Sequence, residues 1–289
     1  NSQTYKQTQD MLRSYDRKLD QRLFSDIDLR YVRGFDMFLQ KRSCCGNTRK
    51  FYFKALRAIL NRANAEGVGS VATYPFGRGG FEVSKLEEAT AKRYLPAAEL
   101  SKLKSTTASN PQCEYARKLF LFSYYCYGIS FIDMAMLTAA HIKQMEDGDY
   151  IVYKRQKIKR QKGVKPISIK ITPAIRQLIE SLQAGSPTVD DFLLPIVTRS
   201  GYTGERLYMH IRTRYSKYQK YLRLLAEELG IDFHLTSYVS RHTAAMTLQR
   251  NHIPREVISQ MLGHADLETT NIYLDSFDNE VINEAAKVL

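Results

Sequence analysis

Apolar positions recur at helical spacing through the first 85 residues. They predict a polar helix over about 4–22, a second helix capped by Ser25, and a third that is capped by Asn47 or Thr48 and ends at Gly67. The second and third helices each carry one apolar side, which we expect to face a core. These apolar positions are Leu29, Val32, Phe35 and Phe38 or Leu39 on the second helix, and Phe53, Leu56, Leu60 and Ala63 on the third.

The third helix also carries a basic side. Lys50, Lys54 and Arg57 recur on it at i, i+4 and i+7, and Arg49 adjoins them. Such a stripe is often only a solvated face. Taken alone, it is equally consistent with a solvated face and with a surface that contacts phosphate groups. The formal net charge of the chain is +13, from 43 Lys+Arg and 30 Asp+Glu, and it favours phosphate contacts.

Glycines and weak periodicity in residues 68–95 predict a loop and a linker. The expected organisation is a helical domain over 1–85, a linker over 86–95 and a second domain over 96–289. The second domain is predicted to contain helices from 96, over 110–127, 129–138, 173–183 and 204–229, and two strands, 150–153 and 164–169, which flank a basic segment. The expected fold class is mainly α with a small antiparallel β-sheet.

The stretch 234–274 contains signals for three further short helices. Thr236 or Ser237 can cap the first, Pro254 opens the second, and Gly263 is expected to end the second in a left-handed conformation. The apolar stripe expected on the second helix consists of Val257, Ile258, Met261 and Leu262. Asp266 can cap the third helix.

This arrangement delivers three chemically distinct side chains, Arg241, His264 and Tyr273, from separate short helices. A guanidinium can bind two phosphate oxygens in a fork, an imidazole can donate or move a proton, and a phenol can act as a nucleophile. The three together suit attack on a phosphate. The simpler alternative is three buried helices with a hydrogen-bonded structural histidine.

Composition narrows the choice of partner. A net charge of +13 implies a polyanion, and no apolar run is long enough to span a bilayer, so nucleic acid is favoured over a membrane. The four cysteines lack metal-site spacing, and we expect free thiols in a reducing cytosol. The chain begins at Asn1 without a methionine, which is consistent with a fragment that lacks N-terminal residues.

Three motifs resemble the signature of the tyrosine recombinase (phage integrase) family: R-H-T at 241–243, L-G-H at 262–264 and T-T-x-I-Y at 269–273. Their conjunction at family spacing is the specific signal, since tyrosine alone is common in this chain. The resemblance implies a SAM-like helical core-binding domain followed by a catalytic domain, which clamp opposite sides of double-stranded DNA. It places the protein in the bacterial cytoplasm, associated with the nucleoid.

The basic segment between the two predicted strands holds a further candidate. Lys157 matches the lysine that the family carries in this hairpin as a general acid for the departing 5′ oxygen, and Lys159 is the nearest alternative. The other cations are expected to graze phosphates or to aid solubility, and Lys159, Arg160 and Lys162 are the predicted DNA-binding residues among them.

Two positions depart from the family pattern. Ser130 stands where the first arginine is expected, although Asp133 keeps the acidic position, and the two residues make a plausible helix cap pair. A serine cannot supply a bidentate charge. Arg155 is the preferred replacement, because on a strand it would share a face with Lys157, whereas Arg117 lies too far back along its helix.

The second departure is Tyr238, which occupies the usual histidine position three residues before Arg241. At this spacing both side chains lie on one helix face, so the Tyr238 hydroxyl is expected to donate to a phosphate oxygen. A phenol shuttles protons less readily than an imidazole at neutral pH, so the duty of general base falls to His264 or to water.

As the resemblance implies, Tyr273 forms a 3′-phosphotyrosyl link while Arg241 and Arg155 hold the phosphate, with no metal or other cofactor. A terminal helix after Tyr273 is expected either to fold onto its own domain or to dock on a neighbouring protomer in a tetramer. The leading hypothesis is a site-specific recombinase of a bacterial mobile element. The alternatives are a non-catalytic DNA-binding protein of the same fold and a type IB topoisomerase-like enzyme.

Overall fold

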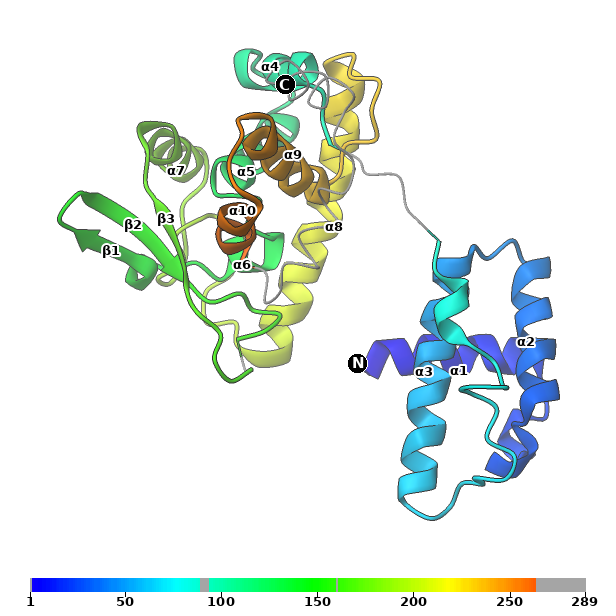
Figure 1. Cartoon of the computed structure of the whole chain (residues 1–289). Helices are drawn as coiled ribbons and strands as arrows, with labels where there is room; N and C mark the ends of the chain where they lie inside the picture. Colours follow the sequence, from blue (N-terminus) through cyan, green and yellow to red (C-terminus); the bar gives the residue numbers. More distant parts are fainter. Residues whose placement is uncertain (1, 89–93, 160, 264–289) are drawn as a thin grey trace, which may run out of the picture. The chain divides into compact units, whose positions relative to one another are not determined.

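The computed structural model of the chain describes residues 2–88, 94–159 and 161–263. The chain forms two compact units, Asn1–Ala91 (unit 1) and Lys92–Leu289 (unit 2), which are described separately (Figure 1). The mostly helical content of these residues and their small antiparallel sheet confirm the predicted fold class. In the described part of the chain no helix is both long and apolar enough to cross a membrane.

Within residues 2–88, unit 1 consists of three α-helices with short 3-10 turns around them. Phe35 on the second helix and Phe53 on the third are fully buried, and their rings meet edge to face with centroids 5.5 Å apart. This contact confirms that the two predicted apolar sides face a common core. The elements are α1 (Ser2–Tyr15), η1 (Leu19–Gln21), η2 (Phe24–Asp26), α2 (Leu29–Lys41), α3 (Gly46–Ala65) and η3 (Val83–Leu86).

The predicted helices of unit 1 differ from their observed bounds, and α3 begins at Gly46 after Cys45, so the predicted caps Asn47 and Thr48 lie inside it. The helix predicted over 4–22 ends at Tyr15. The helix predicted after Ser25 is capped instead by Asp28, whose side chain accepts a hydrogen bond from the Tyr31 amide, while Ser25 lies within the turn η2. A carboxylate that satisfies a free amide of the first helical turn therefore fixes where α2 begins.

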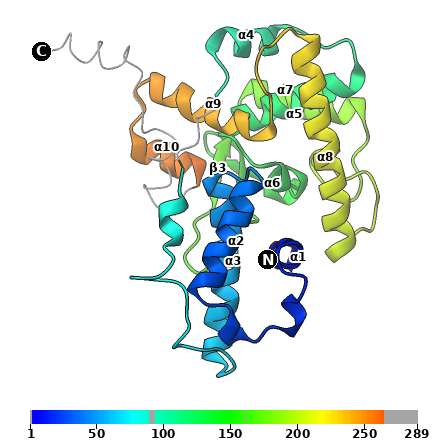
Figure 2. The ribbon, with the colours of Figure 1, turned by 90° about the vertical axis from the view of Figure 1, so that its right-hand side faces the viewer.

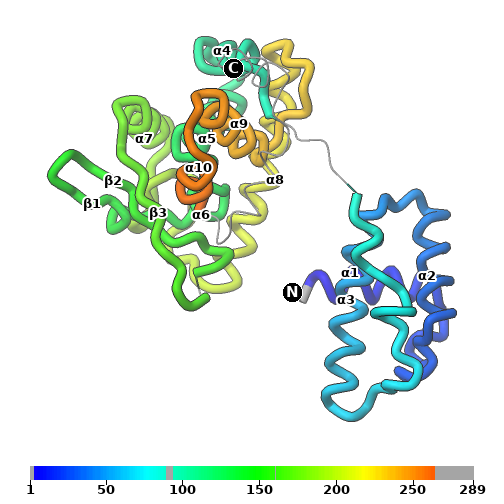
Figure 3. Tube along the Cα trace, viewed as in Figure 1, coloured from blue at the N-terminus to red at the C-terminus, as the bar shows by residue number. Residues whose placement is uncertain are grey.

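Unit 2 combines helices with a three-stranded antiparallel sheet in the order β1-β2-β3. Its helix α10 packs against both α9 and β3, which brings the C-terminal part of the described chain beside the sheet (Figures 1 and 3). The elements are α4 (Ala97–Ser105), α5 (Pro111–Tyr125), α6 (Phe131–Ala135), η4 (Ala139–His141), β1 (Ile142–Met145), β2 (Gly148–Tyr153), β3 (Ile167–Lys170), α7 (Pro173–Gly185), α8 (Gly204–Glu228), α9 (Ser237–Arg250) and α10 (Arg255–Leu262).

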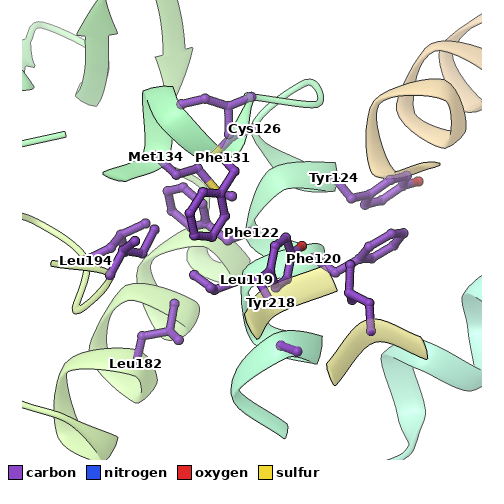
Figure 4. Close-up of a cluster of buried hydrophobic side chains, with 14 of the residues drawn as sticks. Leu119, Phe120, Phe122, Tyr124, Cys126, Phe131, Met134, Leu182, Leu194 and Tyr218 are labelled. Carbon is purple, nitrogen blue, oxygen red and sulfur yellow. The ribbon is translucent and has the colours of Figure 1, made fainter. Parts of the chain in front are cut away.

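Helix α5 is the central element of unit 2 and contacts α7, α8 and α9 (Figure 2). It begins at Pro111, where the Asn110 side chain accepts from two amides of the first turn, as predicted. Its apolar side chains lie in the main core with Phe131 of α6 and Tyr218 of α8, whose rings stack with centroids 5.1 Å apart (Figure 4). This core fixes the C-terminal end of α5, from which the candidate site is built.

Three predictions for unit 2 need correction, and one strand was missed. The strand expected over 164–169 is β3, Ile167–Lys170, and β1 was not predicted because its largely exposed sequence, IKQM, lacks an apolar alternation. The helix expected over 129–138 is only α6. Val257 is 44% exposed, because α10 is short and buries Ile258 and Leu262 instead.

Candidate active site

Arg241 lies at the centre of the candidate site and is almost excluded from solvent. It projects from α9, whose N-cap position is Thr236, one of the two predicted residues, although the Thr236 side chain makes no capping hydrogen bond, and only 3% of Arg241 is exposed. Its Nη1 donates to the Gly128 carbonyl at 3.0 Å, and its Nη2 donates to the Leu262 carbonyl. Main-chain carbonyls from the turn after α5 and from the end of α10 therefore orient this guanidinium.

Gly128 makes this burial possible. Its φ of 71° lies in the left-handed region, and a Cβ added there would come within 2.6 Å of the Arg241 Cγ. A buried hydrogen bond of 2.7 Å between the Ser123 and Ser240 hydroxyls also joins α5 to α9. The turn that follows α5 is thus in direct contact with the turn of α9 that carries Arg241.

A second guanidinium lies near the first. The Arg155 Nη1 donates to the carbonyl of Gly263 at 3.3 Å, one residue beyond the carbonyl that Arg241 contacts. Gly263 ends α10 in the left-handed conformation, with φ of 62°, as predicted. Burial, and next the charge of Arg155, lower the pKa of Arg241 to about 10, so Arg241 remains charged at neutral pH.

Arg155 reaches this position from a loop and not from a strand. β2 ends at Tyr153, and Lys157 lies in the turn that follows, so the same-face argument that linked Arg155 to Lys157 was wrong. Lys157 is exposed and lies between β2 and β3, which is the hairpin in which the resemblance to the family places its lysine. The loop is instead tied to α6, because the Gln156 amide donates to Asp133 Oδ1 at 2.7 Å.

Ser130 and Asp133 form the predicted cap of α6. The Ser130 side chain accepts from the Asp133 amide, and its hydroxyl donates to Asp133 Oδ2 at 2.6 Å. Asp133 is only 3% exposed. Both of its carboxylate oxygens thus accept hydrogen bonds, one from the cap and one from the loop that carries Arg155.

Arg117 is held elsewhere in the unit. Its Nε and Nη2 donate to the two carboxylate oxygens of Glu114 at 2.7 and 2.8 Å, and its Nη1 donates to the carbonyl of Leu103 at 2.7 Å. This geometry ties the start of α5 to α4. The guanidinium of Arg117 therefore has a structural role within unit 2.

Tyr238 lies near the start of α9 with 49% of the residue exposed. Its ring meets the His242 ring edge to face, with centroids 4.9 Å apart. Its electrostatic effect acts to raise the pKa of Arg241, against the effects of burial and of Arg155. His264 and Tyr273, as well as Arg160 and the predicted terminal helix, lie outside the described residues.

The predicted DNA-binding residues have different surroundings. In unit 1 the Arg49 Nη1 lies 2.9 Å from both oxygens of Asp36, and the Lys50 Nζ lies 2.6 Å from Glu87 Oε2. The remaining described members of this set are exposed: Lys54, Arg57, Lys159 and Lys162.

Some contributors to the site were not predicted. The Gln219 side chain accepts from the Ser237 amide at 2.9 Å and donates to the Tyr215 hydroxyl, also at 2.9 Å, so α8 holds the first residue of α9. Nothing in the sequence pattern signals this long-range contact or the ties made by Gly128 and Asp133. Within the ranges that the structure describes, no three His, Cys, Asp or Glu side chains are grouped as metal ligands.

Comparison with known proteins assigns the chain to a family. Residues 93–280 match the Phage integrase family, and residues 1–82 match the Phage integrase SAM-like domain. Since the first match alone covers more than half of the chain, the protein belongs to the phage integrase family of tyrosine recombinases, as its motifs predict.

Individual relatives resemble parts of the chain. Tyrosine recombinase XerD of Halalkalibacterium halodurans is 43% identical over 54 residues, which are 19% of this chain and 18% of that protein. The chain spans less than half the length of the curated relatives it matches. Each of these matches therefore covers only a part of the chain.

Solved structures show the same fold. The XerH site-specific recombinase bound to its palindromic difH substrate, in a post-cleavage complex, has a TM-score of 0.64 at 18% identity, with 91% of this chain and 72% of that chain covered. The Tn1549 transposon integrase in complex with transposon right end DNA has a TM-score of 0.61 at 12% identity, with 91% and 85% covered.

Proposed function

We propose that this protein is a site-specific DNA recombinase that cleaves and rejoins DNA through a 3′-phosphotyrosyl intermediate. The observation that carries the proposal is the pair of guanidinium groups on adjacent carbonyls, Arg241 on Leu262 and Arg155 on Gly263, directly before His264 in the sequence. Neighbouring positive charges repel each other in the free protein, and a phosphate between them relieves this repulsion. Family membership supports the same reaction class.

In this mechanism Tyr273 attacks the scissile phosphorus and the 5′ oxygen leaves. Arg241 and Arg155 each bind a non-bridging oxygen, and His264 and Tyr238 add hydrogen bonds. Lys157 protonates the 5′ oxygen as it departs. The covalent link conserves the energy of the phosphodiester bond, so the 5′-hydroxyl of a partner strand can rejoin it without an external energy source.

Arg155 is proposed as the guanidinium that replaces the one missing at Ser130. Its side chain reaches the Gly263 carbonyl and lowers the pKa of Arg241 electrostatically, second to burial, which supports its nearness to the reacting phosphate. Arg117 is a weaker candidate, because Glu114 and the Leu103 carbonyl occupy its donors.

The proposed partner is double-stranded DNA bound by both units, with unit 1 as the core-binding domain and unit 2 as the catalytic domain. Lys54 and Arg57 on α3, and Lys159 and Lys162 in the segment between β2 and β3, are exposed cations suited to phosphate contacts. Assembly into a tetramer through the terminal helix, and action on a mobile element, belong to the same proposal. The DNA in the XerH and Tn1549 integrase complexes supports the class of partner.

Covalent trapping tests the proposal. The intact protein is mixed with nicked suicide substrates made from candidate junction sites, and adducts are resolved on a denaturing gel. Wild type should give a protein–DNA adduct and Tyr273→Phe should give none. Site-specific binding without an adduct would favour a non-catalytic protein, and relaxation of any supercoiled plasmid by a monomer would favour a type IB topoisomerase-like enzyme.

Lys157 and Lys159 provide a matched pair for the general acid. Lys157→Ala should slow cleavage by about 100-fold or more, while Lys159→Ala, at protein concentrations that saturate the DNA, should leave the cleavage rate near wild type. A substrate whose 5′-bridging oxygen is replaced by sulfur should restore the Lys157→Ala rate, because a thiolate leaves without a proton. Equal losses in both variants would contradict the assignment.

A further inference from the structure

We propose that Asp133 is a positioning residue, which holds the loop after β2 so that Arg155 and Lys157 face the scissile phosphate. This inference rests on the proposed recombinase function. The carboxylate lies on α6, and it acts on the two cations through the main chain of Gln156, the residue between them. Asp133 therefore need not touch the DNA.

Apart from the hydrogen bond of Arg155 to the Gly263 carbonyl, the described part of the loop has few attachments to other elements. The β2–β3 ladder ends at the pair Tyr153 and Ile167, and the hydrogen bond between the Ile158 amide and the Arg155 carbonyl, 3.1 Å long, stays within the turn. The 2.7 Å bond from the Gln156 amide to Asp133 Oδ1 connects this turn to a helix 23 residues away in sequence. An ionised acceptor makes such a bond shorter and stronger than a neutral one.

The carboxylate is itself firmly held. Asp133 is 3% exposed, and its second oxygen accepts from the Ser130 hydroxyl at 2.6 Å. A buried carboxylate is costly unless its oxygens are hydrogen-bonded, so the two donors define its orientation. Ser130, at the position where the family carries an arginine, thus supports the acid that places Arg155.

The negative charge of Asp133 has a second effect, which acts on the guanidinium group of Arg241. Its field acts on Arg241 in the sense that favours the charged guanidinium, opposite to the effects of burial and of Arg155. A carboxylate in this place partly balances two adjacent cations without occupying the face on which a phosphate binds. Asp133 therefore both places Arg155 and makes the closeness of Arg155 and Arg241 less costly.

Single-turnover cleavage tests the inference with three variants. Asp133→Ala should slow cleavage by about 100-fold, as expected when catalytic groups are misplaced, and its affinity for DNA should stay within about twofold of wild type. Asp133→Asn keeps an acceptor for the Gln156 amide and should recover most of the rate. Asp147→Ala, at the exposed turn between β1 and β2, is the matched control and should cleave like wild type.

Two readouts separate positioning from a general loss of structure. The 5′-bridging sulfur substrate should restore part of the Asp133→Ala rate, because it removes the need for Lys157 but not for Arg155. Amide hydrogen exchange of the free protein should be faster at Gln156 in Asp133→Ala and unchanged in the core helix α5.

Wild-type cleavage at full rate by Asp133→Ala, or unchanged exchange at Gln156, would overturn the positioning role and leave the recombinase proposal intact. Failure of the sulfur substrate to restore any activity to Asp133→Ala would also overturn it. Absence of an adduct with the wild type would overturn both proposals.

Discussion

At the scale of single residues, the site depends on a charged side chain that is buried against backbone. Arg241 can be buried because Gly128 leaves room for it and because the Gly128 and Leu262 carbonyls accept its protons. A buried guanidinium that lacked such acceptors would destabilise the fold. Gly128 is therefore required for two reasons, its left-handed φ and the close approach of α9.

Substitution of Gly128 should separate these two requirements. Gly128→Ala should lower the free energy of unfolding by about 3 kcal/mol, because strain at φ 71° adds to the overlap with Arg241. Gly230→Ala is the matched control, since Gly230 also has a positive φ but has open space around it, and it should cost about 1 kcal/mol. Equal losses in urea unfolding would show that the contact with Arg241 is unimportant.

At the scale of elements, α5 organises unit 2, and Arg117 ties its start to α4 through the Leu103 carbonyl while it pairs with Glu114 on the same helix. Burial acts to raise the pKa of Glu114, but hydrogen bonds from Arg117 and from the Ala108 amide outweigh it and lower the pKa. The folded state therefore favours the ionised carboxylate. Its contribution to stability is present above the ordinary glutamate pKa of 4.5 and is lost as the pH falls through the lowered value.

Glu114→Gln should reveal this dependence. At pH 7 the substitution should cost about 2 kcal/mol of unfolding free energy, as expected for hydrogen bonds to a charged group. The difference from wild type should shrink as the pH is lowered below 4.5, because wild type then loses the same interaction. Glu227→Gln, whose exposed pair with Arg223 is 3.9 Å long, should change little at any pH. A cost that stays constant with pH would contradict the account.

Much of the element order could be predicted from local signals. Caps and stops at Asn110, Thr236 and Gly263 gave α5, α9 and the end of α10 close to their observed bounds. β1 could not be predicted, since its four residues, IKQM, are largely exposed and lack an apolar alternation, although its partner β2 is the next strand in the sequence. The hydrogen bonds of Gln156 to Asp133 and of Arg155 to Gly263 join segments that are far apart in the sequence. A local pattern of apolar residues therefore cannot predict them.

At the scale of the whole molecule, a net charge of +13 predicts electrostatic attraction to DNA that salt weakens. The cations of α3 are not equivalent, however. Arg49 and Lys50 have carboxylate partners within unit 1, while Lys54 and Arg57 are exposed. We therefore expect Lys54 and Arg57 to supply phosphate contacts and Arg49 to contribute mainly to stability.

Salt-dependent binding distinguishes these roles. Lys54→Ala and Arg57→Ala should each weaken binding to all DNA sequences alike and reduce the slope of log K against log salt by about one. Arg62→Ala, on the same helix but paired with Glu66, is the control and should leave the slope unchanged. Arg49→Ala should instead lower the stability of unit 1. Unchanged slopes for Lys54→Ala and Arg57→Ala would place the DNA on another face.

The central claim is that Arg241 and Arg155 together neutralise the scissile phosphate, and its most direct test changes the charge of that phosphate. Suicide substrates with an ordinary phosphate or an uncharged methylphosphonate at the cleavage position are compared by the rate of covalent trapping. On the phosphate, Arg155→Ala should be slower than wild type by about 100- to 1,000-fold. On the methylphosphonate, Arg155→Ala should approach the wild-type rate, and Tyr273→Phe should form no adduct on either substrate. Wild-type trapping of the phosphate by Arg155→Ala, or an equal defect on both substrates, would contradict the account.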